Sequence, residues 1–331
     1  MRCAVIGAGA WGTALGDLLA SAGHDVRIWA YEPDVVQSIN ERHENTRFLR
    51  DVRLTPALQA TAEQSQALDQ AGLVIYATPS THLRAIARAG APCIRSETIL
   101  AVASKGIEMG SMALMTDVVS AEVPTNSVVA LSGPSFAAEV AARQPTAVVA
   151  ASVDPDAARA VQEVMSGGTF RVYTHVDVTG VELGGSIKNV MAVAVGILEG
   201  VGLGFNSRAA LITRGLAEMT RLGTSLGARA STFAGLAGVG DLVLTCTGTL
   251  SRNRALGVEV GQGKTLEEAL AGKETVAEGV VTTAGTIELA AREGVEMPIA
   301  EMVYRILFDH HPAKLAAQEL MARELRSEQD E

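Results

Sequence analysis

The sequence has few of the residues that mark secreted, zinc-binding or nucleic-acid-binding proteins. Only three of its 331 residues are cysteines, Cys3, Cys93 and Cys246, and they are far apart. This excludes a disulfide framework and a C-x-x-C zinc site, and it suits a reducing compartment. Lys and Arg number 27 against 37 Asp and Glu, so the formal net charge is -10. We therefore expect neither nucleic acid nor an anionic membrane to be the main partner.

Long hydrophobic runs and metal-binding motifs are also missing. No run reaches the roughly 18 uncharged apolar residues that a membrane-spanning helix needs. The best candidate, residues 189–198, is flanked by Lys188 and Glu199, so we interpret it as a buried helix of a soluble domain. Residues 1–22 loosely resemble a signal peptide, but Asp17 interrupts them and their glycines have nucleotide-binding spacing. The six histidines form no metal motif, and no metal site is predicted.

What is present indicates two globular domains. Hydrophobic residues make up 48% and charged residues 19%, a composition typical of packed domains. Continuous apolar runs predict strands at 2–6, 25–29, 73–78, 98–103, 128–132, 147–151 and 170–173. Runs without alternation are typical of a parallel sheet covered on both faces. Helices are predicted between them, with Ser80 preceding one and Asp154 capping another before Pro155.

After about residue 179 the sequence is rich in Ala, Leu, Met and Glu, with glycine clusters at 200–204, 235–240 and 257–263 as punctuation. The predicted fold class is α/β: a Rossmann-type, doubly wound parallel sheet at 1–179, followed by an all-helical domain at 180–331.

A glycine motif follows the first strand and begins a helix. Gly7 would permit the tight turn, Gly9 the approach of a pyrophosphate, and Gly12 the close packing of helix on strand. The helix N-terminus would supply N–H groups to the phosphates. With strand, helix and a later acidic residue in place, the motif predicts dinucleotide binding.

That acidic residue is Glu32, about 20 residues after the motif at the end of the second strand. Its carboxylate can accept hydrogen bonds from ribose hydroxyls but would repel a 2′-phosphate, so NAD is favoured over NADP, which remains possible. The alternative is that Glu32 only begins the next helix with Pro33 and faces solvent.

The second half contains polar residues in apolar or glycine-rich surroundings. Lys188 precedes the apolar run 190–198, so we expect it at the start of a buried helix, where desolvation and the helix dipole lower its pKa. Such a lysine can act as a general base; alternatively it extends to the surface. Asp241, between glycines and an apolar stretch, could orient that lysine or serve as a helix N-cap.

Two further groups are candidates for ligand binding. The segment Ser251-Arg252-Asn253-Arg254 could clamp a phosphate through Arg252, or could be a basic surface turn. Lys105 and the segment 132–137 follow predicted strands, at the carboxyl edge where α/β sheets bind ligands, although a plain turn also explains 132–137.

These motifs together resemble the bacterial glycerol-3-phosphate dehydrogenase family, nearly from end to end. The matching segments are GAGAWGTAL (7–15), SKG (104–106), SGPS (132–135), GGSIKN (184–189), LITRGLAE (211–218), GDLVLTCT (240–247), SRN (251–253) and AEG (277–279). The resemblance implies a nicotinamide-dependent enzyme that interconverts sn-glycerol 3-phosphate and dihydroxyacetone phosphate for glycerophospholipid synthesis. It also implies a helical second domain similar to the C-terminal domain of 6-phosphogluconate dehydrogenase.

The resemblance also implies roles for individual residues. Lys188 would be the proton acceptor, with Asp241 and Lys105 as the other catalytic residues. The implied substrate contacts are Lys105, Gly133, Ser135, Lys188, Asp241, Ser251, Arg252 and Asn253. The implied or predicted coenzyme contacts are Gly7, Gly9, Ala10, Trp11, Gly12, Tyr31, Glu32, Lys105, Ala137, Arg252, Val276 and Glu278. Many members have a basic residue where this chain has Glu32, beside Tyr31, which agrees with a preference for NAD.

Two other functions are compatible with the motifs. One is a related two-domain hydroxyacid dehydrogenase that acts on a small carboxylate, which would also use a lysine and an arginine. The other is a non-catalytic NAD-binding redox sensor, which would not need the lysine, aspartate and arginine together. We expect a cytoplasmic protein with a small-molecule substrate and a possible homodimer.

Overall fold

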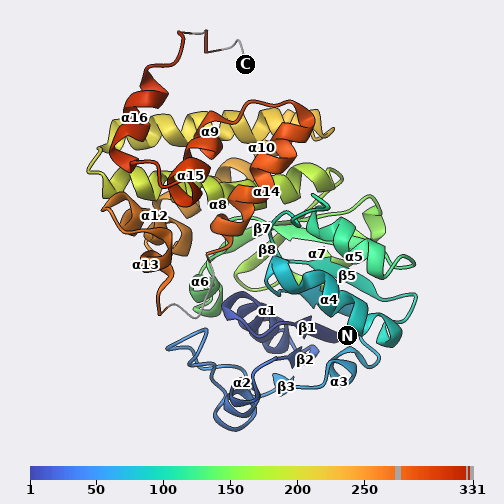
Figure 1. The fold of residues 1–331 in the computed structure, drawn as a ribbon. Coiled ribbons are helices and arrows are strands. Elements are labelled where there is room, and N and C mark those ends of the chain that lie inside the picture. Colours follow the sequence, from blue (N-terminus) through green and yellow to red (C-terminus); the bar gives the residue numbers. More distant parts are fainter. Residues whose placement is uncertain (273–276, 326, 329–331) are drawn as a thin grey trace. The chain divides into compact units, whose positions relative to one another are not determined.

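The computed structural model describes residues 1–272, 277–325 and 327–328. The chain forms two compact units (Figure 1). Unit 1 comprises Met1–Lys105 and Met115–Val178, and unit 2 comprises Gly106–Leu114 and Thr179–Glu331. The units differ from the expected domains 1–179 and 180–331 mainly in the segment Gly106–Leu114, so the predicted boundaries stay a prediction.

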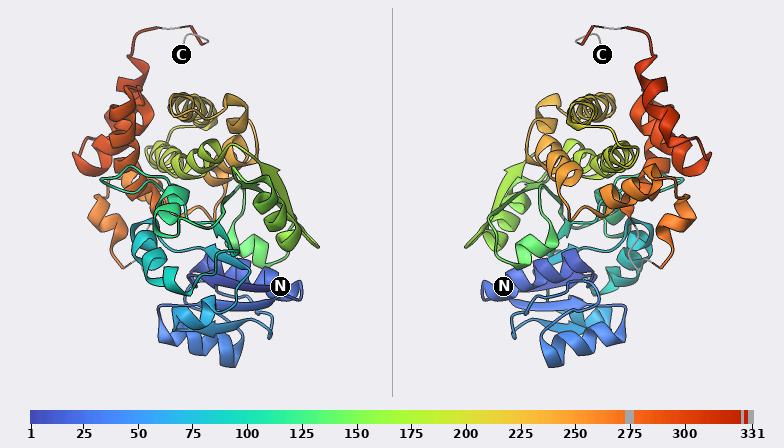
Figure 2. Two further views of the ribbon diagram at one scale, coloured as in Figure 1. Left: turned by 90° about the vertical axis from the view of Figure 1, so that its right-hand side faces the viewer. Right: turned by 90° about the vertical axis from the view of Figure 1, so that its left-hand side faces the viewer.

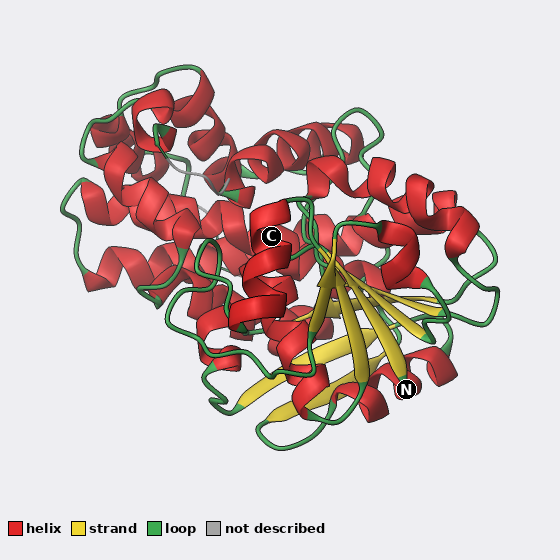
Figure 3. Ribbon diagram, turned by 90° about the horizontal axis from the view of Figure 1, so that it is seen from below, coloured by secondary structure: helices red, strands yellow, loops and turns green. Residues whose placement is uncertain are grey.

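Unit 1 contains a twisted eight-stranded sheet flanked by helices (Figure 3). The strands are β1 (Arg2–Ile6), β2 (Asp25–Trp29), β3 (Gln59–Thr61), β4 (Leu73–Tyr76), β5 (Ile99–Val102), β6 (Val128–Ser132), β7 (Thr146–Ala151) and β8 (Phe170–His175). Their spatial order is β3-β2-β1-β4-β5-β6-β7-β8. The predicted doubly wound sheet is confirmed. The short, polar β3 was not predicted, and β6 pairs with β7 antiparallel, which a pattern of buried runs cannot distinguish.

The helices of unit 1 lie between its strands, as predicted. They are α1 (Ala10–Ser21), α2 (Pro33–Gln37), α3 (Gln64–Leu68), α4 (Ser80–Gly90), α5 (Met115–Glu122), α6 (Ala137–Ala141) and α7 (Pro155–Met165), with short turns η1 (Ser38–Arg42) and η2 (Ala91–Cys93). Asp154 caps α7, because its carboxylate accepts hydrogen bonds from the N–H groups of Asp156 and Ala157 at 3.0 and 3.3 Å. The core of the unit includes fully buried residues such as Val5 and Leu15.

Unit 2 is helical, as predicted, apart from an isolated bridge between Ile107 and Leu114 in the part of the unit that the structure describes. Its elements are α8 (Val178–Gly200), α9 (Phe205–Ser225), α10 (Ala230–Phe233), η3 (Leu236–Gly240), α11 (Asp241–Thr247), α12 (Arg252–Gly261), α13 (Leu266–Leu270), α14 (Glu278–Glu293), α15 (Pro298–Phe308) and α16 (Ala313–Met321). The views in Figures 1 and 2 agree that α8 and α9 lie side by side.

Helix α8 is the central helix of unit 2. By length and composition it could cross a membrane, but 94% of its most apolar window is buried inside the structure, as in the core helix of a globular protein. The helix begins at Val178, well before the predicted start near residue 190, because the glycines at 184 and 185 do not interrupt it.

Four glycines lie inside two crossing helices, and three of them, Gly200, Gly257 and Gly261, were interpreted from the sequence as punctuation. Gly196 and Gly200 of α8 face Gly257 and Gly261 of α12. A Cβ atom built on Gly257 would lie 2.9 Å from the Cα of Gly196, and one built on Gly261 would lie 3.0 Å from the Cα of Gly200. The absence of side chains therefore lets the two backbones touch, and this crossing sets the position of α12 against α8.

Candidate functional site

The glycine motif lies where the strand order of the sheet reverses. β1 pairs with β2 on one side and with β4 on the other, and ligands of doubly wound sheets bind at this point. Gly7 has φ +112°, and a Cβ on it would lie 2.7 Å from the carbonyl oxygen of Ala77. A Cβ on Gly12 would clash with the carbonyl oxygen of Gly7, whereas one on Gly9 would have no other atom within 4 Å. Only glycine fits at positions 7 and 12, while position 9 borders open space.

This geometry fits a dinucleotide. Gly9 is the N-cap of α1, and Ala10 and Trp11 form the first turn, so the N–H groups of that turn point towards the open space beside Gly9. The assignment of Gly7, Gly9, Ala10, Trp11 and Gly12 as coenzyme contacts stays a prediction.

Glu32 lies beyond β2 at the N-cap position of α2, and Pro33 is the first residue of that helix. The alternative in which Glu32 begins the next helix is therefore right about position. Its side chain is half-buried, however, and makes no capping hydrogen bond. The carboxylate therefore does not cap α2, and its oxygens can accept hydrogen bonds from a ribose. The neighbouring Tyr31 is 81% exposed.

The other predicted residues of unit 1 follow β5 and β6 at the same carboxyl edge as Gly7. Lys105 is half-buried and follows Ser104, whose hydroxyl donates to the carbonyl of Thr78 at 2.6 Å. Gly133 has φ +141°, and the hydroxyl of Ser135 donates to its carbonyl at 2.9 Å. Ala137 begins α6. The sheet topology thus gathers these residues, distant in sequence, along one edge of unit 1.

In unit 2 the predicted lysine and aspartate form a buried ion pair. The Nζ of Lys188 contacts Oδ1 of Asp241, and the two side chains are 9% and 1% exposed. Asp241 is the first residue of α11, and its Oδ1 also accepts a hydrogen bond from the hydroxyl of Thr245 at 3.4 Å. The predicted interaction between this carboxylate and the lysine is therefore present, and the surface-exposed alternative for Lys188 is wrong.

One part of the argument for Lys188 is also wrong. The lysine lies in the middle of α8, and not at its start, so the positive end of the helix dipole does not act on it. Burial disfavours the charged ammonium, but the adjoining carboxylate favours it. The amine and the carboxylate are therefore held together in a position shielded from water.

Asn253 connects three helices of unit 2. Its Nδ2 donates to Oδ1 of Asn189 at 2.9 Å, and its Oδ1 accepts from the N–H of Gly279 at 2.9 Å. Asn189 follows Lys188 in α8, and Gly279 follows Glu278 in α14. Sequence reasoning missed Asn189 as a site residue, although it adjoins Lys188 in the GGSIKN segment. The contact brings α12 and the first turn of α14 next to α8.

The two arginines of the SRNR segment have different surroundings. The guanidinium of Arg254 pairs with the carboxylate of Glu199 at 2.7 and 3.0 Å. Arg252 is the exposed first residue of α12, and Ser251 caps this helix by accepting the N–H of Arg254 at 3.2 Å. The segment is thus a helix N-terminus with an exposed guanidinium, and not a plain surface turn. Such a helix N-terminus favours an anionic ligand.

Unit 1 therefore gathers the glycine turn and the strand-end residues, and unit 2 gathers Lys188, Asp241, Asn253 and Glu278. Glu278, the first residue of α14, is half-buried. The predicted coenzyme contact Val276 lies outside the described residues. A buried thiol, Cys246, also adjoins the ion pair, and burial raises its pKa to about 12, so it is a neutral packing group.

Two family models match the chain. Residues 2–158 match the N-terminus of NAD-dependent glycerol-3-phosphate dehydrogenase, and residues 177–318 match its C-terminus. Among curated relatives, a glycerol-3-phosphate dehydrogenase (NAD(P)+) from Geobacter sp. (strain M21) is 51% identical over 330 residues, which cover 99% of this chain and 98% of the relative. The corresponding protein of Nitratidesulfovibrio vulgaris (strain Hildenborough) is 49% identical over 332 residues, 99% of this chain and 100% of the relative.

A solved structure is similar throughout. The crystal structure of glycerol-3-phosphate dehydrogenase from Coxiella burnetii has a TM-score of 0.93 and 40% sequence identity, and the match covers 97% of this chain and 98% of that one. Both units of this chain therefore have counterparts in a single known protein.

Proposed function

Because the chain belongs to the NAD-dependent glycerol-3-phosphate dehydrogenase family, we propose that Lys188 is the proton-transferring residue of its reaction. The protein is an oxidoreductase that interconverts sn-glycerol 3-phosphate and dihydroxyacetone phosphate with NAD(P)(H). The observation that supports the role of Lys188 is its buried ion pair with Asp241. An ammonium held in a dry site beside one carboxylate is a positioned proton donor.

In the reductive direction, Lys188 donates its proton to the carbonyl oxygen of dihydroxyacetone phosphate, which becomes the C2 hydroxyl. In the oxidative direction, the uncharged amine accepts the hydroxyl proton. When bound, the nicotinamide coenzyme supplies or accepts the hydride at C2. Asp241 holds the amine in place and compensates its charge when it is protonated.

Arg252 and the N-terminus of α12 are the proposed binding site of the substrate phosphate. Guanidinium groups bind two phosphate oxygens at once, and the N–H groups of a helix N-terminus favour an anion. Asn253 is fixed by Asn189 and Gly279, so its second Nδ2 hydrogen has a fixed direction. Binding the phosphate, which does not react, orients C2. Contacts from Lys105, Gly133, Ser135 and Ser251 belong to the same proposal.

For the coenzyme, the glycine turn and the first turn of α1 would hold the pyrophosphate, and Glu32 the adenosine ribose. The carboxylate of Glu32 is half-buried and not used for capping, which supports NAD over NADP. Tyr31, Lys105, Ala137, Arg252, Val276 and Glu278 complete the proposed coenzyme contacts.

The protein would act on small molecules in the cytoplasm and would supply glycerol 3-phosphate for glycerophospholipids. A homodimer belongs to the same proposal, and analytical ultracentrifugation would test it.

The role of Lys188 is tested with two variants. Lys188→Ala removes the amine, and Lys188→Arg keeps a charge opposite Asp241 but cannot exchange its proton near neutral pH. We expect both to lose at least about a hundredfold in the rate of NADH oxidation with dihydroxyacetone phosphate. NADH binding, measured by fluorescence titration, should survive. A matched control is Lys264→Ala, because Lys264 is 51% exposed and pairs with Glu259 at the surface.

The same assay tests the substrate. Small keto acids should be turned over much more slowly than dihydroxyacetone phosphate, whereas the reverse order would favour a hydroxyacid dehydrogenase. Near-normal rates in the Lys188→Arg variant would show that Lys188 is not the residue that transfers the proton. Coenzyme binding without turnover of any substrate would favour the redox sensor.

A further inference from the structure

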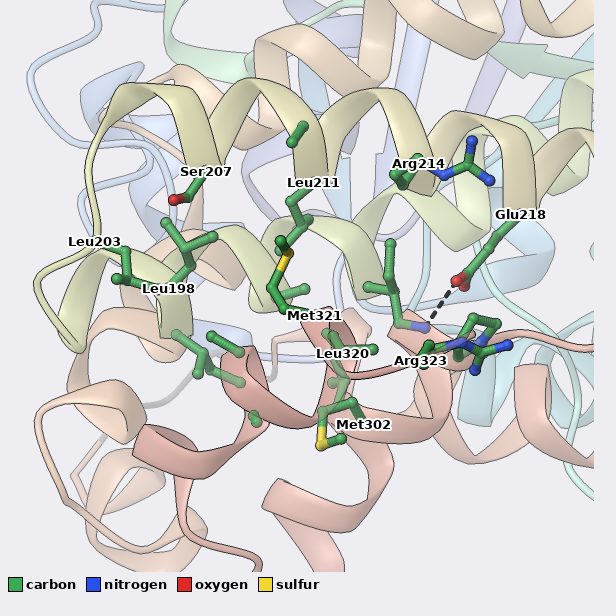
Figure 4. A pocket seen from close by; sticks show the side chains of 18 of the residues that line it. Leu198, Leu203, Ser207, Leu211, Arg214, Glu218, Met302, Leu320, Met321 and Arg323 are labelled. Carbon is green, nitrogen blue, oxygen red and sulfur yellow. Dashed lines mark hydrogen bonds between the residues drawn. The ribbon is translucent and has the colours of Figure 1, made fainter. Parts of the chain in front are cut away.

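Unit 2 contains a cavity that the reaction does not use. It lies between α8, α9, α15 and α16 and has a volume of about 680 Å³ (Figure 4). This is within the range of small-molecule sites, about 300 to 1,000 Å³. None of the residues that line it belongs to the predicted active or coenzyme site. The cavity is open to solvent, because its lining includes the exposed residues Met321 and Leu325.

Most of the lining is apolar. Leu198 of α8 and Leu211 of α9 form one side, and Met302 of α15 and Leu320 of α16 form the other. The methionine side chains are flexible and can adapt to the shape of a bound chain. An unbranched hydrocarbon group would bury its surface against these side chains.

The polar side chains gather at one end. Figure 4 shows Leu198 and Leu203 at one end of the cavity and Arg214, Glu218 and Arg323 at the other. Arg221 also lines the cavity, and its guanidinium donates to the backbone carbonyl of Glu296 at 2.9 and 3.2 Å. Three arginines therefore line the cavity beyond its apolar part.

Four glutamates also line the cavity, and two of them, Glu218 and Glu296, have the partners described here. Glu218 is 2% exposed, and its carboxylate accepts the N–H groups of Ile299 and Ala300 at 2.7 and 3.3 Å. Burial raises the pKa of Glu218 to about 7, so near neutral pH it is partly uncharged. Arg323 pairs with Glu296 at 3.3 Å, but both side chains are 41% or more exposed, and such surface pairs are weak and exchange readily. Glu324 and Glu328 lie at the exposed rim.

We propose that this cavity binds a single-chain amphiphile with an anionic head group, such as a medium-chain fatty carboxylate. The chain lies between α8–α9 and α15–α16, and the carboxylate binds the guanidinium groups, taking the place of Glu296 on Arg323. A guanidinium binds a carboxylate through two parallel hydrogen bonds, which fixes the head at the arginine end. The site is separate from the proposed catalytic residues, so its test does not depend on the reaction.

The test measures binding of sodium decanoate, below its micelle concentration, to the full-length protein by isothermal titration calorimetry. We expect saturable binding at one site. Decyltrimethylammonium has the same chain with a cationic head, and we expect it to bind at least about tenfold more weakly. Short-chain acetate should not bind measurably at the same concentration.

Two variants connect binding to this cavity. Leu211→Trp fills the cavity from α9 and should weaken decanoate binding at least about tenfold. Thr213→Trp introduces the same side chain at an exposed position of the same helix outside the lining, and should bind as the unmodified protein does. Arg214→Gln should weaken decanoate but leave decyltrimethylammonium unchanged.

Several results would overturn the proposal. One is non-saturable decanoate binding, which indicates partition onto the surface. Another is equal binding by Leu211→Trp and the unmodified protein, which places the site elsewhere. Equal affinity for the two head groups would show that the arginines do not select. If decanoate fails to bind and Leu211→Trp instead changes the sedimentation coefficient, the face is covered by a second copy of the chain.

Discussion

At the level of single residues, the arrangement around Lys188 shows how a costly group is kept in a core. Removing one partner of a buried ion pair leaves an uncompensated charge and costs about 3 to 5 kcal/mol. Lys188 and Asp241 are both nearly inaccessible, so each requires the other. A buried pair is weak evidence for stability, which agrees with the proposed role of Lys188 in proton transfer.

Arg252 is the residue for which the phosphate proposal makes the sharpest prediction. Arg252→Ala removes an exposed guanidinium from the first turn of α12, so the fold should be unaffected. The KM for dihydroxyacetone phosphate should rise by about tenfold to a hundredfold, the usual contribution of a charge-assisted pair. Steady-state kinetics at saturating NADH measure this. Arg292→Ala, which removes an exposed arginine paired with its neighbour Glu293, is the control. An unchanged KM would show that Arg252 does not bind the substrate phosphate.

Glu32 makes a separate prediction about coenzyme choice. Glu32→Arg replaces a carboxylate that repels a 2′-phosphate by a group that binds it. The ratio of kcat/KM for NADPH to that for NADH should rise by about tenfold or more. The neighbouring exposed acid Asp34 provides the control variant Asp34→Arg. If both variants leave the ratio constant, the carboxylate at position 32 does not contact the ribose.

At the level of helices and strands, the crossing of α8 and α12 positions proposed site residues of unit 2. Lys188 is on α8, and Arg252 and Asn253 begin α12. Gly196, Gly200, Gly257 and Gly261 let the two helices approach until their backbones touch. The glycines thus affect the site indirectly, because they set how closely the two helices that carry these residues approach each other.

Gly257→Ala tests the importance of this close approach. The new Cβ would clash with the carbonyl oxygen of Val193 and lie 2.9 Å from the Cα of Gly196, and neither backbone can move freely. We expect a loss of about 1 to 3 kcal/mol in the free energy of unfolding, as is usual for overpacked cores. Urea denaturation measures it. Gly167→Ala is the control, because a Cβ there has no other atom within 4 Å. A stability equal to that of the control would show that the crossing is not tight.

At the level of the molecule, each unit has its own hydrophobic core, and unit 2 also encloses an acidic residue, Glu218. Burial raises its pKa to about 7, although the N–H groups of Ile299 and Ala300 and the nearby Arg221 oppose this shift. The unfolded chain ionises this group at the ordinary glutamate pKa of 4.5. Between these values the folded state binds more protons than the unfolded state does, so this residue's contribution to stability falls as the pH rises.

Glu218→Gln removes this titration. The free energy of unfolding of the unmodified protein should fall relative to that of the variant as the pH rises from 5 to 8, by at most about 3 kcal/mol. Urea denaturation at several pH values measures the difference, and other ionisable groups cancel in the comparison. A difference that is constant with pH, or that changes in the opposite direction, would show that the folded-state pKa of Glu218 is not raised.

The strands of unit 1 and the helical nature of unit 2 could be predicted from the sequence, because runs of apolar residues and their period depend on local order. The short strand β3 and the antiparallel β7 could not, since Gln59–Thr61 has little apolar character and strand direction depends on the connections. The start of α8 was missed because the glycines at 184 and 185 weaken a helix locally, whereas tertiary packing stabilises it.

From the chain of amino acids alone follow the glycine turn, the family, the candidate lysine and aspartate, and the acidic residue beside the coenzyme motif, because each depends on residue type at short spacing. The pairing of Lys188 with Asp241, the junction of Asn189 with Asn253, and the helix crossing through four glycines required the fold. These contacts join residues about 50 to 65 positions apart, and only the packing of α8 against α11 and α12 decides which distant side chains share a buried, low-dielectric environment.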